Sequence, residues 1–159
     1  MNTKNAITII PFSADLKEPF KELNYEWLKK YFKIEPKDKR VLSNPQEEII
    51  DKGGMIFYAK YHDKIVGTVA LINIDKNLFE LSKMAVTDDV QGLGIGKKLL
   101  QHCIEAAEKQ KIKTLLLYSN RSLVPAIHLY HKFGFVEVPL EEGVYERADI
   151  KMRKNIYGL

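Results

Sequence analysis

The sequence predicts an α/β fold (α/β in the broad sense that includes α+β) with one mixed, mostly antiparallel sheet flanked by helices. Apolar residues recur at helical spacing over two long stretches, residues 15–32 and 95–110, and β-rich runs lie before, between and after them. The expected order of elements is β-α-α-β-β-β-α-β-α-β-β. No repeat, low-complexity tract or linker interrupts this order, so residues 1–159 are expected to form a single domain.

The N-terminal part of the chain predicts one strand and two helices. The expected elements are a strand over residues 7–12, a long helix over 15–32 and a short helix over 46–52. The basic stretch 29–40 also contains Glu35 and Asp38, and this mixture of charges favours a solvated loop. Gly53 and Gly54 are expected to end the short helix.

The remainder predicts most of the sheet. The expected elements are strands over residues 55–61, 65–74 and 78–86, a helix over 95–110, a strand over 113–118, a helix from Pro125 to a stop at Gly134, and strands over 135–138 and 148–152. The run Leu-Leu-Leu-Tyr that ends at Tyr118 is typical of a strand buried on both faces.

Composition excludes several classes of protein. The chain has 159 residues, a hydrophobic content of 45%, a charged content of 29% and a formal net charge of +4, which is typical of a globular protein and only mildly basic. The lone Cys103 can form no disulfide within the chain, and no cluster has the spacing of metal ligands. No run resembles a signal peptide or a membrane span. We expect a cytoplasmic protein without a metal.

The most informative segment is the glycine-rich stretch 86–97, Val-Thr-Asp-Asp-Val-Gln-Gly-Leu-Gly-Ile-Gly-Lys, between an expected strand and an expected helix. Glycines allow a sharp turn there and leave the backbone N–H groups of the first helical turn uncovered. Those N–H groups have no partner within the helix, and the helix dipole adds partial positive charge. The segment therefore predicts a site for a phosphate or pyrophosphate.

Two other glycine-rich motifs do not fit this segment. A dinucleotide-binding fingerprint that began at Gly92 would need a glycine at Lys97. A P-loop ending in Gly96-Lys97 would need a glycine at Gln91 and a serine or threonine at Lys98.

The stretch from Gln91 to Gly96 resembles the Q-x-x-G-x-G pattern of the GNAT superfamily of acyl-CoA N-acyltransferases. The run ELSKMAV, residues 80–86, is similar to the central strand of that family, and PAIHLYHKFGF, residues 125–135, is similar to its second helix on the coenzyme A side. The resemblance extends over nearly the whole chain. It implies a GNAT-like domain that transfers an acetyl or other acyl group from acetyl-CoA to a primary amine, by direct attack within a ternary complex.

The resemblance also assigns residues to coenzyme A. The amides of residues 92–97 would hold the pyrophosphate, and the backbone of residues 84–86 would pair with the pantetheine arm as an added strand does. Asn120 takes the place of an asparagine that the family commonly has at the position of Leu123. The full assigned set is Met84, Ala85, Val86, Gln91, Gly92, Leu93, Gly94, Ile95, Gly96, Lys97 and Asn120.

Two further residues match catalytic positions of the family. Tyr130 corresponds to a tyrosine that points at the coenzyme A sulfur and can protonate the leaving thiolate; the alternative is an aromatic core residue. Glu80 corresponds to a glutamate that serves some branches as general base, and the alternative is a solvated residue of a strand. A base is needed because an amine of pKa ~10.4 is almost wholly protonated, and unreactive, at pH 7.

The acceptor is left open between a small-molecule amine and a peptide amine. The candidate substrate residues are Tyr25, Tyr31, Tyr145 and Arg147, and Arg147 could hold a carboxylate. Trp27 has the spacing of a core residue. No nucleic-acid or membrane partner is expected, and many members of the family form homodimers. The alternative function is a non-catalytic, CoA-binding regulatory module.

Overall fold

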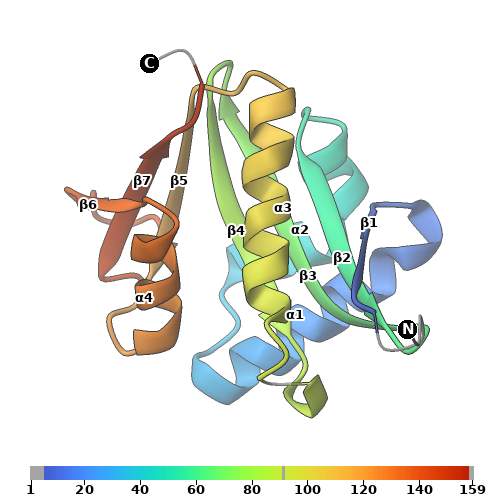
Figure 1. Ribbon diagram of the computed structural model, residues 1–159. Coiled ribbons are helices and arrows are strands. Elements are labelled where there is room, and N and C mark those ends of the chain that lie inside the picture. The colour runs from blue at the N-terminus through green and yellow to red at the C-terminus, as the bar shows by residue number, and fades with distance from the viewer. Residues whose placement is uncertain (1–5, 91, 158–159) are drawn as a thin grey trace.

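A computed structural model describes residues 6–90 and 92–157, which form one mixed sheet with helices on both faces (Figure 1). The strand order is β1-β2-β3-β4-β5-β7-β6, and every neighbouring pair is antiparallel except β4 and β5. The strands are β1 (Thr8–Pro11), β2 (Met55–Tyr61), β3 (Lys64–Asp75), β4 (Leu78–Val86), β5 (Thr114–Ser119), β6 (Val136–Val138) and β7 (Ile150–Asn155). The predicted fold class is therefore confirmed.

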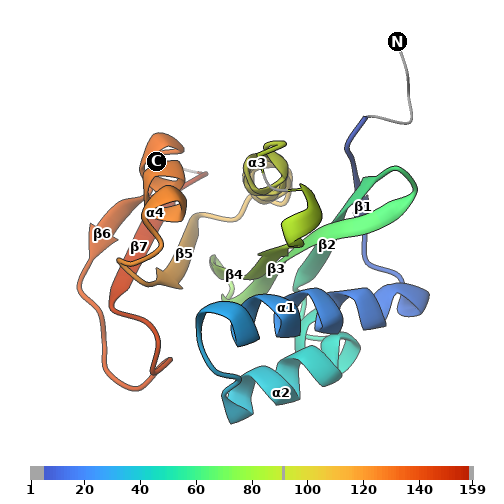
Figure 2. The ribbon, with the colours of Figure 1, turned by 90° about the horizontal axis from the view of Figure 1, so that it is seen from below.

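The helices lie in two layers. They are α1 (Lys17–Tyr31), α2 (Pro36–Ser43), α3 (Ile95–Lys109) and α4 (Val124–Lys132), with short helical turns at Ala14–Leu16, Gln46–Ile50 and Asp88–Val90. Seen from below, α1 and α2 cover one face of the sheet, whereas α3 and α4 lie on the other (Figure 2). Within the described part of the chain, no helix has both the length and the apolar character needed to cross a membrane.

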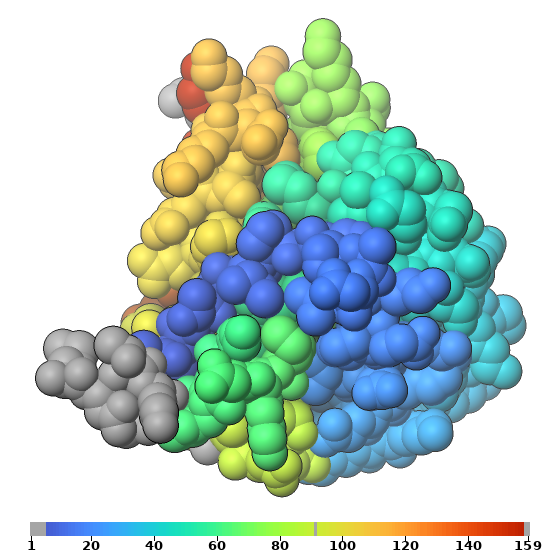
Figure 3. Space-filling model, turned by 90° about the vertical axis from the view of Figure 1, so that its right-hand side faces the viewer, coloured from blue at the N-terminus to red at the C-terminus, as the bar shows by residue number. Residues whose placement is uncertain are grey.

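A separate hydrophobic core fills each side of the sheet. The larger core contains the buried face of α3, with Ile95, Leu99 and Cys103 among its members. The second core packs α1 and α2 against the other face of β2 and β3. At the β1 edge, the space-filling view shows the blue N-terminal segment between the yellow helix α3 and the lighter blue helices on the opposite side (Figure 3).

Gly67 on β3 determines how closely the start of α3 approaches the sheet. A Cβ atom at this position would lie 3.0 Å from Cγ2 of Ile95 and 3.2 Å from Cδ1 of Leu99. Both distances are shorter than ordinary van der Waals contact, so a side chain here would push the helix outward. The glycine thereby allows the start of α3 to pack closely against β3.

The prediction of a solvated loop is wrong for residues 36–43, which form helix α2. Pro36 occupies the first turn, where its missing N–H removes no hydrogen bond. Glu35 and Asp38 form a reciprocal capping box, in which Asp38 accepts the amide of Glu35 at 2.9 Å. The acidic residues that suggested a mixed-charge loop are therefore the residues that begin the helix.

Most element boundaries differ from the prediction by one or two residues, and two elements differ in type or extent. Residues 46–50 form a single π-helical turn rather than a short α-helix over 46–52. The last strand begins at Ile150 and continues to Asn155, later than the predicted range 148–152. It is displaced because β7 pairs with the whole length of β5, from Ser119 opposite Ile150 to Thr114 opposite Asn155.

Asp38 is fully buried and joins α2 to two other elements. It accepts a hydrogen bond from Nζ of Lys83 on β4 at 2.7 Å, and from both terminal nitrogens of Arg147, before β7, at 2.8 and 3.0 Å. Burial alone would raise the pKa of Asp38, but the hydrogen bonds from Arg147 and the charge of Lys83 lower it to about 2. Burial lowers the pKa of Lys83, and the charge of Asp38 opposes that change.

These contacts predict a specific acid sensitivity. A carboxylate whose pKa is lowered by folding stabilises the fold at pH values above its pKa in the unfolded chain, which is near 4. This contribution to stability is lost as the pH falls from there toward 2. We expect about 2 kcal/mol of the free energy of unfolding to disappear over that window. Urea unfolding at pH 2 to 6 measures it. The variant Asp38→Asn should be less stable at pH 6 and should lack this part of the acid dependence.

The matched control is Asp63→Asn, at an exposed position in the turn between β2 and β3. This variant should keep the acid dependence of the unchanged protein. The same loss of stability on acidification in Asp38→Asn would contradict the role given to Asp38.

Candidate active site

The site begins where β4 and β5 separate. The two parallel strands pair at Leu78, Phe79 and Glu80, and their pairing ends where Glu80 lies opposite Leu116. Beyond that point the strands diverge, and a cavity of about 410 Å³ lies between them. The cavity is lined by both strands, by the C-terminal part of α1, by the start of α4 and by Tyr145, Arg147 and Ala148. A volume of this size suits a small-molecule site.

A β-bulge in β4 shapes one wall of this cavity. Thr68 pairs with Ala85 and Ala70 pairs with Ser82, so Lys83 and Met84 together oppose a single residue of β3. Lys83 has a φ of 56°, which is uncommon for a residue other than glycine. The bulge reverses the alternation of side chains: Met84 packs with the α3 core, whereas Lys83 reaches Asp38 on α2.

The predicted phosphate-binding turn lies beside the end of β4. Gly92 and Gly94 have φ values of 85° and 74°, and a Cβ atom at either position would meet nothing within 4 Å. Helix α3 begins at Ile95, and the backbone amide of Lys98 donates to the carbonyl of Gly94 at 3.1 Å. The amides that precede Lys98 in the first turn have no carbonyl four residues back within the helix. Gln91 lies outside the described residues.

The first turn of α3 lies against the bulged strand at Gly96. A Cβ atom there would lie 4.0 Å from the sulfur of Met84. The turn and the cavity thus meet along β4, with Met84, Ala85 and Val86 lining the cavity. The structure therefore brings together two segments that the sequence analysis assigned to coenzyme A: residues 84–86 and residues 92–97.

Tyr130 comes from α4 and lines the cavity from the side opposite β4. It is 9% exposed, and its ring packs edge-on against Phe135 with centroids 6.0 Å apart. Burial, followed by the proximity of Cys103, raises the pKa of Tyr130 to about 12. The phenol therefore stays protonated at neutral pH and can donate a hydrogen bond into the cavity. Packing and donation are compatible here, because the ring is buried in the core while the residue borders the cavity.

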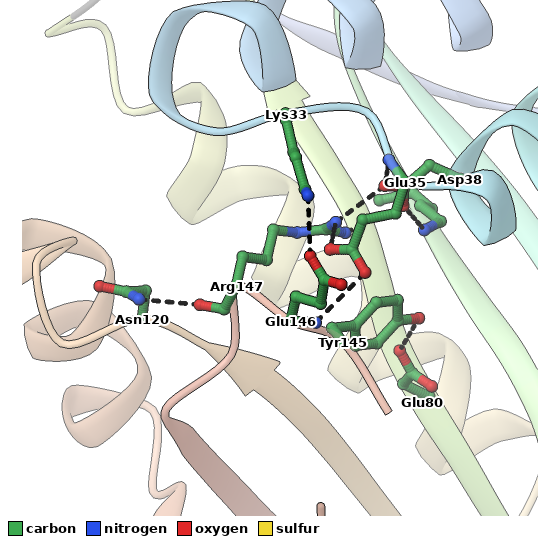
Figure 4. A network of polar contacts seen from close by, with 9 residues as sticks. Lys33, Glu35, Asp38, Glu80, Asn120, Tyr145, Glu146 and Arg147 are labelled. Carbon is green, nitrogen blue, oxygen red and sulfur yellow. Dashed lines mark hydrogen bonds and ion pairs between the residues drawn. The ribbon is translucent and has the colours of Figure 1, made fainter. Parts of the chain in front are cut away.

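Glu80 lies on β4 at the last paired position before the strands separate. It is 4% exposed, so the alternative of a solvated strand residue does not hold. The hydroxyl of Tyr145 donates to Oε2 of Glu80 at 3.0 Å (Figure 4). No ion pair within 4.0 Å is found for Glu80 in the part of the chain that the structure describes. Burial, followed by the charge of Glu80, raises the pKa of Tyr145.

The candidate substrate residues separate into two groups. Tyr31, Tyr145 and Arg147 line the cavity, whereas Tyr25 does not and packs with the second core. The guanidinium of Arg147 is bound by the protein's own carboxylates, Glu35 and Asp38, rather than presented to a ligand.

Asn120 also lines the cavity, but its side chain already has two partners. Its Nδ2 donates to the carbonyl of Arg147 at 2.8 Å, and its Oδ1 accepts from the amide of Ser122 at 2.9 Å. It therefore ties the end of β5 to the segment before β7. Contact of Asn120 with coenzyme A stays a prediction.

Two residues of the site were missed in the sequence analysis, and a third, Trp27, was assigned to the core alone. Trp27 lines the cavity as well as packing with the second core, which its helical spacing did not distinguish. Lys83 and Asp38 form a buried ion pair between segments 45 residues apart. Nothing local marks the bulge that turns Lys83 toward Asp38. Among residues 6–90 and 92–157, no group of His, Cys, Asp or Glu is arranged to hold a metal ion.

Comparison with known proteins places this geometry in a family. Residues 21–135 match the model described as the acetyltransferase (GNAT) family. Among relatives, the uncharacterized N-acetyltransferase YvbK of Bacillus subtilis is 29% identical over 101 residues, covering 62% of this chain and 65% of that protein. The ribosomal protein bS18-alanine N-acetyltransferase of Escherichia coli K12 is 38% identical over 69 residues, covering 43% of this chain and 47% of that protein.

The chain thus spans about half to two thirds of the length of these relatives. A solved GNAT-family acetyltransferase from Staphylococcus aureus Mu50 is similar over 95% of this chain and 99% of its own, with a TM-score of 0.84 and 30% identity. The chain belongs to the GNAT family of acetyltransferases.

Proposed function

We propose that this protein transfers an acetyl group from acetyl-CoA to a primary amine by direct attack within a ternary complex. The observation that carries the proposal is the separation of β4 from β5 after Glu80, beside the glycine turn that begins α3. Two groups suited to acid–base chemistry, Glu80 and Tyr130, line the resulting cavity. Their position favours catalysis over a regulatory module that only binds coenzyme A.

The residues present suit acetyl-CoA. The amides of residues 92–97 at the start of α3 would hold the pyrophosphate, and the edge of β4 over residues 84–86 would face the pantetheine arm. Gly92 and Gly94 have no side chain to cover these amides, and the space around them is open. When bound, acetyl-CoA supplies a thioester carbonyl that a neutral amine can attack.

Glu80 would act as the general base. Its carboxylate would remove the proton from an acceptor ammonium, directly or through a water molecule, because only the neutral amine is nucleophilic. The hydrogen bond from Tyr145 to Oε2 holds one oxygen of the carboxylate in place, while Oε1 has no donor among the described residues. We assign proton removal to Oε1.

Tyr130 would donate a hydrogen bond to the leaving thiolate of coenzyme A. With a pKa of about 12 the phenol is a weaker acid than free tyrosine, so complete transfer of its proton to a thiolate with a conjugate acid near ~8.5 is uphill. Its contribution is then a hydrogen bond to developing negative charge from a buried donor that stays protonated throughout the neutral range.

Coenzyme A binding is tested through Gly94. Acetyl-CoA at roughly a hundred times its Kd should raise the free energy of unfolding by about 2.7 kcal/mol, seen as a higher Tm. In Gly94→Val, we expect roughly tenfold weaker binding, because a β-branched residue resists the φ of 74° and the first amides of α3 are displaced.

The matched control is Gly143→Val. Gly143 also has a positive φ, 86°, and also has open space around it, but it lies outside the turn. An equal loss of acetyl-CoA affinity in both variants, or no stabilisation of the unchanged protein by acetyl-CoA, would contradict the assigned site.

The variant Tyr130→Phe tests the proposed hydrogen bond to the leaving thiolate. Removal of the hydroxyl should lower kcat by roughly a hundredfold and leave the KM for acetyl-CoA within about twofold, because the lost hydrogen bond forms mainly in the transition state. Thiol release at saturating amine measures both constants. Tyr118→Phe removes a hydroxyl that also borders the cavity but donates to Glu141, and it should be nearly neutral. Unchanged kcat in Tyr130→Phe would remove its role.

The variant Glu80→Gln tests the proposed general base. The amide cannot accept the proton, so kcat/KM for the amine should fall by roughly a hundredfold or more, and the remaining rate should simply follow the fraction of free amine that is neutral at each pH. The measurement is the dependence of kcat/KM on pH. Stabilisation by acetyl-CoA, which does not depend on the base, should be retained. A pH–rate profile like that of the unchanged protein would place the base elsewhere.

A further inference from the structure

We propose that the acceptor is a small primary amine with an apolar or aromatic body and no carboxylate, rather than the N-terminus of a polypeptide. This inference rests on the proposed transferase function and narrows its substrate. It is carried by the contacts at one end of the cavity, by the character of the cavity walls and by the balance of charge on them.

An ionic bridge lies at the end of the cavity that Arg147 lines, and it joins residues 33–38 to the segment before β7. We use this name for the contacts of Lys33, Glu35 and Asp38 with Glu146 and Arg147 (Figure 4). Nζ of Lys33 lies 3.0 Å from Oε2 of Glu146, and Glu35 accepts from the amide of Glu146 at 3.2 Å. Arg147 donates to Glu35 at 2.7 Å and to both oxygens of Asp38.

The inner part of this bridge is not free to separate. Asp38 has no exposed surface, and the side chain of Arg147 is 18% exposed. Separating them would leave buried charge without compensation. On its other side the same segment is held by the hydrogen bond from Asn120 to the carbonyl of Arg147. A polypeptide acceptor needs a passage for the residues behind its terminal amine, and the bridge occupies this end of the cavity.

The cavity walls suit an apolar body. Trp27, Tyr31 and Phe32 contribute from α1 and its end, and Tyr118 and Tyr145 contribute from the other side, with ring centroids 5.7 Å apart. Such aromatic surfaces bind rings and alkyl chains by burial of apolar area and edge-to-face contact. Tyr31 is 46% exposed, so the cavity lining reaches the surface at this residue, and a small molecule can approach there without separating the bridge.

The charges on the walls favour an amine without an acid group. Of the described residues that line the cavity, Glu80 is the one carboxylate, and Lys83 and Arg147 are the two cations. Both cations are already paired with Asp38, and Arg147 also with Glu35. A protonated amine therefore finds the unpaired charge of Glu80, whereas a substrate carboxylate finds no cation that is free to bind it.

A panel of four amines that differ in one feature at a time tests this inference. The amines are phenethylamine, phenylalanine amide, phenylalanine, and an otherwise uncharged octapeptide with an N-terminal phenylalanine and an amidated C-terminus. Each is assayed with acetyl-CoA by thiol release and by mass of the product. Phenethylamine should give a kcat/KM about a hundredfold above those of phenylalanine and the peptide, and no more than about tenfold above that of phenylalanine amide.

Failure of the inference and failure of the proposed function give different results. A peptide or phenylalanine used as well as phenethylamine, by a protein that acetyl-CoA stabilises, overturns the acceptor class alone. Stabilisation by acetyl-CoA with no acetylation of any amine in the panel also overturns it. No stabilisation and no thiol release overturn the transferase function together with the inference.

The bridge itself is tested by Arg147→Met, which keeps the volume of the side chain and leaves the pair of Lys83 with Asp38. Loss of the bridge should raise the kcat/KM for the peptide, relative to that for phenethylamine, by about tenfold. The control is Arg40→Met on the outer side of α2, where the arginine is exposed, and it should leave the ratio unchanged. Retained stabilisation by acetyl-CoA shows that Arg147→Met is folded, and an unchanged ratio in that folded variant overturns the role of the bridge.

Discussion

The site depends on one constraint, the short parallel pairing of β4 with β5. The strands pair only from Leu78 to Glu80 on β4, and both are anchored by buried residues on either side of that region. Past Glu80 each strand follows a different neighbour: β4 stays with β3, and β5 stays with β7. A sheet that splits in this way exposes backbone groups at its centre rather than at an outer edge. This position puts them next to the N-terminus of α3 and between two helical layers.

The split sheet needs something to hold its halves together, and the buried ion pairs around Asp38 do this. Asp38 belongs to α2, Lys83 to β4 and Arg147 to the segment before β7, so one carboxylate connects both halves. Buried ion pairs are weak evidence for stability, because desolvation offsets much of their attraction. Their effect here is geometric: with bidentate contacts to Arg147, Asp38 fixes the distance between the first turn of α2 and Arg147. The cavity keeps its shape on that side for this reason.

Much of the fold could be predicted from the sequence, because its elements follow local rules. The apolar positions of α3 recur at helical spacing, the hairpin of β2 and β3 has a short polar turn, and Gly134 ends α4 as expected. The glycine turn could be predicted because glycine readily adopts a positive backbone φ, so the residue type itself indicates the turn. Helix α2 was missed because its capping residues, Glu35 and Asp38, are acidic residues in a basic stretch, and such a mixture of charges is also typical of loops.

The part of the site that could not be predicted is set by tertiary contacts. A strand that alternates regularly would turn Lys83 away from α2, and only the bulge opposite β3 directs it to Asp38. Arg147 was predicted as a residue that could hold a substrate carboxylate, but its partners in the structure are carboxylates of the protein 109 and 112 residues away in sequence. Distances of this kind follow from packing, and a single sequence holds no local signal for them.

The same packing explains how a buried glutamate can be oriented for proton removal. Three cations surround the ring of Tyr145, with Nζ of Lys37 at 4.6 Å, Nζ of Lys83 at 5.1 Å and Cζ of Arg147 at 4.8 Å from its centroid. Cations near an aromatic face are attracted to its negative quadrupole, so all three help to fix the ring. Two of them, Lys83 and Arg147, also pair with Asp38, and Arg147 pairs with Glu35 as well. A fixed ring aims its hydroxyl at Oε2 of Glu80. The other carboxylate oxygen is then left to the cavity, and the ions that join the two halves of the sheet also orient the candidate base.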